Sequence, residues 1–134
     1  MSKAPPPVQN LMKWSEEHGF AATARARGDS AKSDFTLSDG RRSVHVNCTR
    51  GSWSVGVGAQ DWSTAFSVAT WLEYLDGVIA EIRERNLDED VEFVTGRWLR
   101  AFDRLDDVSA AHAELERIDR NTVLRWAREH QPRR

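Results

Sequence analysis

The chain has 134 residues, of which 40% are hydrophobic and 30% charged, and its formal net charge is −2 at pH 7. This length fits one domain that can bury a hydrophobic core without needing disulfides or a bound metal, and the composition is that of a globular protein. A single cysteine, Cys48, excludes an internal disulfide and a cysteine-rich metal site. No apolar run approaches the roughly 20 residues that span a bilayer, so we expect no membrane segment and a cytoplasmic protein.

The first half of the chain predicts a helix followed by an antiparallel sheet. Residues 1–7 contain three prolines and are expected to form a flexible leader, which leaves 8–134 as one α+β domain. Apolar residues at helical spacing predict a helix from Val8 that ends at Gly19. Alternating apolar residues predict four strands, at 20–27, 34–37, 43–49 and 53–59. A tight turn at Asp39–Gly40 makes these strands a meander.

The second half changes to a helical period. A long amphipathic helix is expected over residues 63–86, capped by Ser63, to cover the sheet. Its core stripe is predicted to consist of Val68, Leu72, Leu75, Ile79 and Ile82. An acidic loop over 86–96 and a helical extension over 97–134 are expected to follow, so that 8–85 forms a helix–meander–helix unit.

No motif in the chain predicts catalysis. The four histidines lack the i, i+4 spacing of a helical metal site, and Asp61 stands where a nucleotide-binding loop after Gly56 and Gly58 would need a third glycine. The two glycines instead leave one face of their strand bare, so that another segment can approach closely. We therefore expect a protein that is not an enzyme and holds no cofactor or metal.

Charge is distributed unevenly along the chain. Residues 61–92 hold nine acidic residues against Arg83 and Arg85, a formal −7, whereas residues 120–134 carry a formal +4. Acidic and apolar residues of the expected loop are predicted to bind a basic cleft of a partner protein: Asp88, Glu89, Asp90, Glu92 and Phe93. Trp53 and Trp62 are candidate anchors of the same surface, with core packing as the alternative for both.

The basic end of the chain allows a second hypothesis. Residues 109–128 have the apolar spacing of a helix-turn-helix motif, which supports the alternative hypothesis of a DNA-binding regulator, with a phage-related protein as one form of it. The DNA-contacting residues would then be Arg120, Asn121, Arg125 and Arg128. Arg117 occupies the turn position that favours glycine, and the net acidic charge also weighs against DNA. The other interpretation is a packed terminal helix, anchored by Val123 and Trp126, whose arginines pair with the chain's own acidic middle.

The order of these elements also carries a resemblance. A helix ending in "WSEEHGF", a hairpin through "SDGRRSVHV", then "WSV" and a helix "FSVATWLEYL" resemble, in layout, the small α+β immunity proteins of bacterial polymorphic toxin systems. The resemblance covers roughly residues 10–85. It implies a bacterial, non-catalytic inhibitor that binds a cognate toxin or enzyme and blocks its active site.

Overall fold

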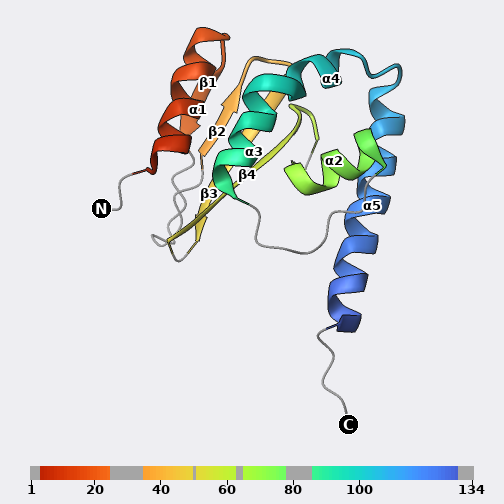
Figure 1. The fold of residues 1–134 in the computed structure, drawn as a ribbon. Helices are drawn as coiled ribbons and strands as arrows, with labels where there is room; N and C mark the ends of the chain where they lie inside the picture. Colours follow the sequence, from red (N-terminus) through yellow and green to blue (C-terminus); the bar gives the residue numbers. More distant parts are fainter. Residues whose placement is uncertain (1–3, 25–34, 50, 63–64, 78–85, 130–134) are drawn as a thin grey trace.

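The computed structural model describes residues 4–24, 35–49, 51–62, 65–77 and 86–129 (Figure 1). The fold is α+β, as predicted: an N-terminal helix, an antiparallel sheet and then helices. In chain order the elements are α1 (Pro6–Glu17), β1 (Ala21–Ala24), β2 (Phe35–Ser38), β3 (Arg42–Thr49), β4 (Ser52–Ala59), β5 (Phe66–Ser67), α2 (Val68–Asp76), α3 (Leu87–Phe93), the π-helical segment η1 (Val94–Trp98), α4 (Leu99–Asp103) and α5 (Val108–Glu129).

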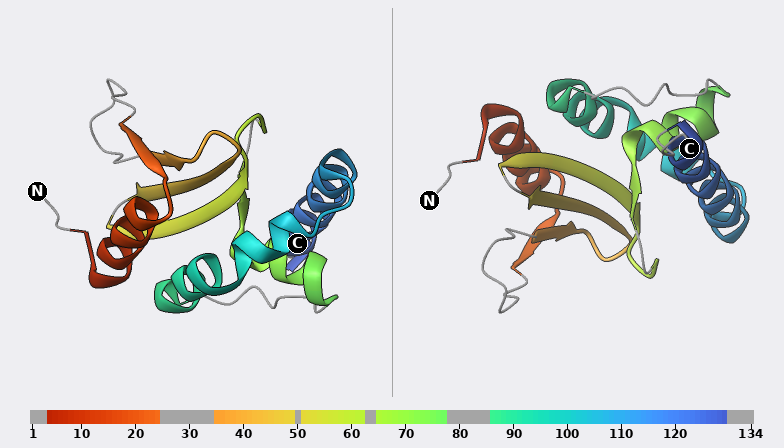
Figure 2. Two further views of the ribbon diagram at one scale, coloured as in Figure 1. Left: turned by 90° about the horizontal axis from the view of Figure 1, so that it is seen from above. Right: turned by 90° about the horizontal axis from the view of Figure 1, so that it is seen from below.

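The sheet has the strand order β1-β2-β3-β4-β5, which confirms the predicted meander and adds a short fifth strand. Residues opposite each other on neighbouring strands share a face of the sheet. A buried row across the sheet consists of Leu37, Val44, Val57 and Phe66. Asn47 and Ser54 oppose each other on the other face and are exposed. The sheet therefore has one apolar and one polar face, and α1 and α3 both lie on the apolar one (Figure 2).

Helix α1 begins earlier than expected. Pro6 and Pro7 belong to its first turn, where the N–H that proline lacks would have no helical partner, so the predicted boundary of a leader at residue 7 is wrong. Residues 1–3 of that leader lie outside the described residues. Val8 and Leu11 are fully buried, and Gly19, with a φ of 79°, lets the chain turn back into β1.

Asp39 fixes the predicted turn between β2 and β3. One carboxylate oxygen, Oδ1, accepts hydrogen bonds from the backbone N–H groups of Arg41 (2.9 Å) and Arg42 (2.7 Å), and Oδ2 accepts one from the Arg42 guanidinium (3.0 Å). Partial burial of Asp39 favours the neutral acid, but these hydrogen bonds outweigh it and hold the pKa of the carboxyl below its ordinary value. The next residue, Gly40, has a φ of 91°, which favours glycine.

The predicted long helix over 63–86 is wrong in its extent. The described helix, α2, begins only after β5, and its cap is Ser67, whose hydroxyl accepts the backbone N–H of Thr70 at 3.3 Å. Gly77, with a φ of 69°, ends it. Val68 is buried, as the predicted stripe requires, and Leu72 and Leu75 are half-buried. Ser63, Ile79 and Ile82 lie outside the described residues.

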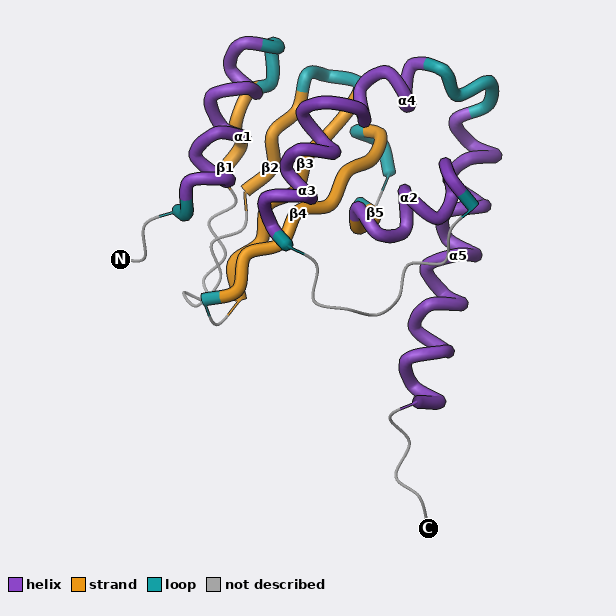
Figure 3. Tube along the Cα trace, viewed as in Figure 1, coloured by secondary structure: helices purple, strands orange, loops and turns teal. Residues whose placement is uncertain are grey.

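The predicted acidic loop over 86–96 is also wrong, because this segment is helical. The Asn86 side chain caps α3 by accepting the backbone N–H of Asp88 at 2.9 Å, and acidic residues in the first turn stabilise a helix N-terminus. The apolar residues of the segment recur at helical spacing and face the core: Leu87, Val91, Val94 and Trp98. Figure 3 shows α3, η1 and α4 as one helical path.

An aromatic cluster joins the sheet to the C-terminal helices. Its rings are those of Trp62, Phe66, Trp71, Tyr74, Trp98, Phe102 and His112. The Trp62 indole lies against Gly58, where an added Cβ would be only 2.6 Å from the ring. The strand face that was predicted to be bare at Gly56 and Gly58 is thus covered by Trp62 and by the backbone of Phe66. The fully buried Trp71 donates its indole N–H to the Val57 carbonyl at 2.9 Å.

Residues 108–129 form the single helix α5, so the predicted pair of helices with a turn near Arg117 is wrong. Arg117 lies in mid-helix and pairs with Glu114 one turn earlier. The predicted anchor Val123 is 58% exposed, and the side chain of Trp126 lies outside the described residues. Among the described helices, none has the length and apolar character needed to cross a membrane.

Candidate protein-binding groove

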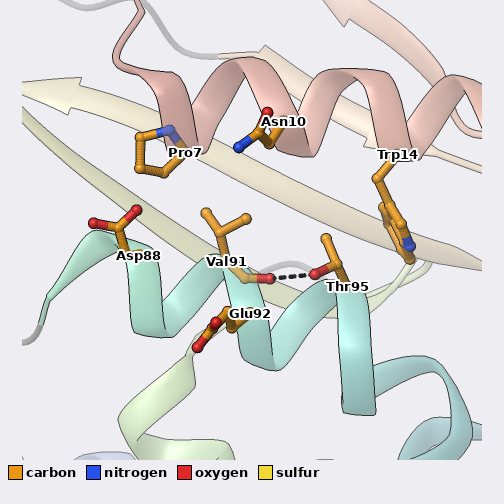
Figure 4. Close-up of a pocket in the computed structure, with 7 residues that line it drawn as sticks. All are labelled: Pro7, Asn10, Trp14, Asp88, Val91, Glu92 and Thr95. Carbon is orange, nitrogen blue, oxygen red and sulfur yellow. Dashed lines mark hydrogen bonds between the residues drawn. The ribbon is translucent and has the colours of Figure 1, made fainter.

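A groove of about 320 Å³ runs between α1 and the start of the α3–η1 path (Figure 4). Its residues from α1 are Pro7, Asn10 and Trp14, and those from α3 and η1 are Asp88, Val91, Glu92 and Thr95. Both sets follow the three- and four-residue spacing that places side chains on one face of a helix. Two helices that are distant in sequence therefore present facing sides to a common space.

Helix α3 forms the acidic side and the floor of the groove. Asp88 and Glu92 are exposed and one helical turn apart, whereas Val91 between them points toward α1 and is only 6% exposed. The Thr95 hydroxyl donates to the Val91 carbonyl at 2.9 Å, so its polar group is satisfied within the helix. The groove thus combines an apolar floor with two carboxylates at its edge.

Helix α1 contributes an aromatic wall that neighbouring rings hold in place. The half-buried Trp14 indole stacks on the His18 imidazole, with 4.6 Å between centroids and 26° between planes. It also contacts the Phe20 ring, with centroids 5.4 Å apart. His18 is fixed in turn by a 2.8 Å hydrogen bond between its Nδ1 and the Trp14 carbonyl. A wall ordered in advance loses little conformational entropy when a ligand binds.

The groove carries negative charge from Asp88 and Glu92. Within the described part of the chain, neither the Asp88 nor the Glu92 carboxylate has a salt-bridge partner. Among the same residues, no group of three or more His, Cys, Asp or Glu side chains is arranged to hold a metal ion. The groove chemistry therefore favours a cationic side chain, which can meet the carboxylates and lie against the indole face.

The structure separates the acidic residues predicted as one binding surface. Asp88 and Glu92 line the groove, whereas Glu89 is exposed on the same helix outside it. Asp90 is half-buried. Phe93 is only 7% exposed, so the predicted apolar tip is wrong: its segment is a helix and its ring packs in the hydrophobic core.

Both candidate tryptophan anchors are packing residues. Trp53 is half-buried against the core, and Trp62 stacks on Trp71 with centroids 6.1 Å apart. This packing agrees with the alternative considered for both from sequence, and their contact with a partner stays a prediction. The tryptophan of the groove is Trp14, which was not among the binding residues predicted from sequence. The signal in the sequence is the helical spacing of Pro7, Asn10 and Trp14, which places them on one side of α1.

The residues proposed for DNA contact all lie on α5. Arg120, Asn121 and Arg128 are exposed. Arg125 is half-buried and forms a 3.4 Å ion pair with Glu73 of α2, which confirms at this one pair that the basic end meets the acidic middle. The motif that was to present these residues to a DNA groove is absent, because α5 is uninterrupted. Comparison with protein-family models, with curated proteins and with solved structures finds no match to this chain.

Proposed function

We propose that this chain is a non-catalytic protein-binding module that holds a basic segment of its partner in the α1–α3 groove. The observation that carries the proposal is that Asp88, Glu92 and Trp14 line one groove. A volume of about 320 Å³ is at the lower end of the range of about 300–1,000 Å³ that holds small molecules, and it suits one or two inserted side chains. Arginine, with a planar cation on an apolar stem, matches all three parts of the groove.

Electrostatic attraction brings such a segment to the groove. The carboxylates of Asp88 and Glu92 lie on the exposed edge, and Glu89 adds negative charge nearby. Charges at the edge of an interface mainly raise the association rate and fix the register of the partner. Binding should therefore weaken as salt rises, because the Debye length falls to about 8 Å at 0.15 M.

We further propose that the module acts as an inhibitor or immunity protein, whose partner is a toxin or enzyme with a basic active-site cleft. Two features support this role. The layout of residues 10–85 resembles that of small α+β immunity proteins, and an acidic groove complements a cleft that binds an anionic substrate. A basic segment from the edge of that cleft, held in the α1–α3 groove, would keep this chain over the cleft and block the substrate without any chemistry by this chain.

The direct test is a titration of the ¹⁵N-labelled protein with a hexa-arginine peptide, followed by NMR. We expect the largest shifts at the Asn10, Glu92 and Thr95 amides and at the Trp14 indole N–H, and we expect them to weaken between about 0.02 and about 0.3 M salt. A hexaglutamate peptide is the matched control and should cause none of them. Shifts that are scattered over the surface, or confined to α5, would contradict the proposal.

A further inference from the structure

The outward face of α5 carries an exposed stripe that no other described element covers. Its residues are Ser109, Ala113, Glu116, Arg120, Val123 and Ala127, all of them exposed. They alternate by four and three residues, which is the a and d spacing of a helix that pairs with another helix. Ala111, Leu115 and Ile118 on the opposite face are buried, and α5 lies at the edge of the molecule in Figures 1 and 2.

The last turns of α5 hold two exposed apolar residues, Val123 within this stripe and Leu124 beside it. Val123 is 58% and Leu124 49% exposed, and they are the exposed large hydrophobic side chains among the described residues. Both lie beyond Ile118, the last residue of α5 that is buried, where the helix extends away from the body (Figure 1). A helix end with little packing is only marginally stable in water, so a partner along this face would stabilise it.

The stripe is complementary to itself when a second copy runs antiparallel. With the two-fold axis crossing the exposed stripe at the level of residue 118, Ala113 faces Val123 of the second copy, and Ser109 faces its Ala127. Small residues then meet apolar ones along the contact. Glu116 faces Arg120 of the second copy, and two-fold symmetry makes each of these contacts twice. The stripe spans about 27 Å at a rise of 1.5 Å per residue.

We propose that a second copy of this chain docks antiparallel along α5 to form a symmetric dimer. Glu116 of each copy pairs with Arg120 of the other. Val123 and Leu124 of each copy pack near Ala113 and Ser109 of the other. Glu116 already lies 3.2 Å from Nδ1 of His112, but half of its side chain remains exposed. Helices α1 and α3, which line the groove, lie apart from α5 in Figure 1, so the dimer leaves both grooves open.

Analytical ultracentrifugation over a range of concentrations tests this dimer. Because one pair of helices buries less than the roughly 1,200–2,000 Å² of a standard interface, we expect a weak dimer, with a dissociation constant of about 100 µM. E116R and R120E should each weaken it by about tenfold or more, because each places like charges opposite each other. The double variant E116R/R120E should return it to within about threefold of the original, since the pairing is reversed.

Two controls keep the outcome specific. E89R makes the same charge change on α3, away from the stripe, and should leave the dimer unchanged. Circular dichroism shows whether each variant keeps its helix, and V123S/L124S tests the apolar contact without any change in charge. A protein that stays monomeric up to about 1 mM, or a double variant no better than the single ones, would overturn the proposal.

Discussion

The contact between Gly58 and Trp62 predicts a cost for one added methyl group. In Gly58→Ala the new Cβ would lie 2.6 Å from Cε3 and 3.2 Å from Cζ3 of the indole, so the ring must move. Trp62 cannot move freely, because it contacts Phe66, Trp71 and Phe102. Overpacking of this kind costs about 1–3 kcal/mol. The lower backbone entropy of unfolded alanine offsets roughly 0.5–1 kcal/mol, which leaves a destabilisation of about 1 kcal/mol.

Urea unfolding followed by far-UV circular dichroism measures this change. Gly96→Ala is the matched control, because no atom lies within 4 Å of its added Cβ and alanine favours a helix, so we expect a gain of about 0.5–1 kcal/mol. In a Trp62→Ala background Gly58→Ala should cost less than about 0.5 kcal/mol, because the clash has been removed. A Gly58→Ala protein as stable as the original would refute the packing described for Trp62.

Two further predictions concern buried polar groups. Trp71→Phe should destabilise the protein by about 1–3 kcal/mol more than Trp98→Phe. Both indoles are fully buried, but that of Trp71 donates a hydrogen bond to Val57, whereas the Trp98 N–H has no partner within the described residues. Equal costs of the two substitutions in urea unfolding would contradict this. Asp39→Ala should cost about 1.5–3 kcal/mol at pH 7. Since the folded-state pKa of Asp39 is lowered, its contribution to stability is present above the unfolded pKa and is lost as pH falls through the folded value. The difference in unfolding free energy between Asp39→Ala and the original protein should therefore shrink as pH falls below about 4. A difference that does not depend on pH would count against the turn described here.

The sheet was predictable because its information is local. Alternation placed Val44, Val46 and Val57 on one face, and Asp39–Gly40 marked the turn. Helix α3 was missed because a run of acidic residues is typical of loops, and the run outweighed the helical spacing of Val91, Val94 and Trp98 in the same segment. Those acidic residues are instead compatible with a helix because they lie at its N-terminus.

The groove itself could not be predicted from local patterns. It requires α1 and α3, which are separated by the whole sheet in sequence, to lie side by side on one face of that sheet. Tertiary packing also decided which face of α5 is buried. Ala111 and Leu115 are covered and Val123 is exposed, although hydrophobicity alone favours the burial of valine over alanine.

The affinity of a hexa-arginine peptide for a charge-neutralised groove tests the central claim most directly. Asp88→Asn/Glu92→Gln removes two carboxylates from the groove, and Asp106→Asn/Asp119→Asn removes two exposed carboxylates far from it, so both variants have the same net charge. At about 0.5–1 kcal/mol for each exposed contact, the groove variant should bind roughly 5- to 30-fold more weakly by calorimetry. The control should stay within about twofold of the original at about 0.15 M salt, because distant charges are screened. Equal losses in the two variants would show that the peptide senses only net charge, and would contradict a binding site between α1 and α3.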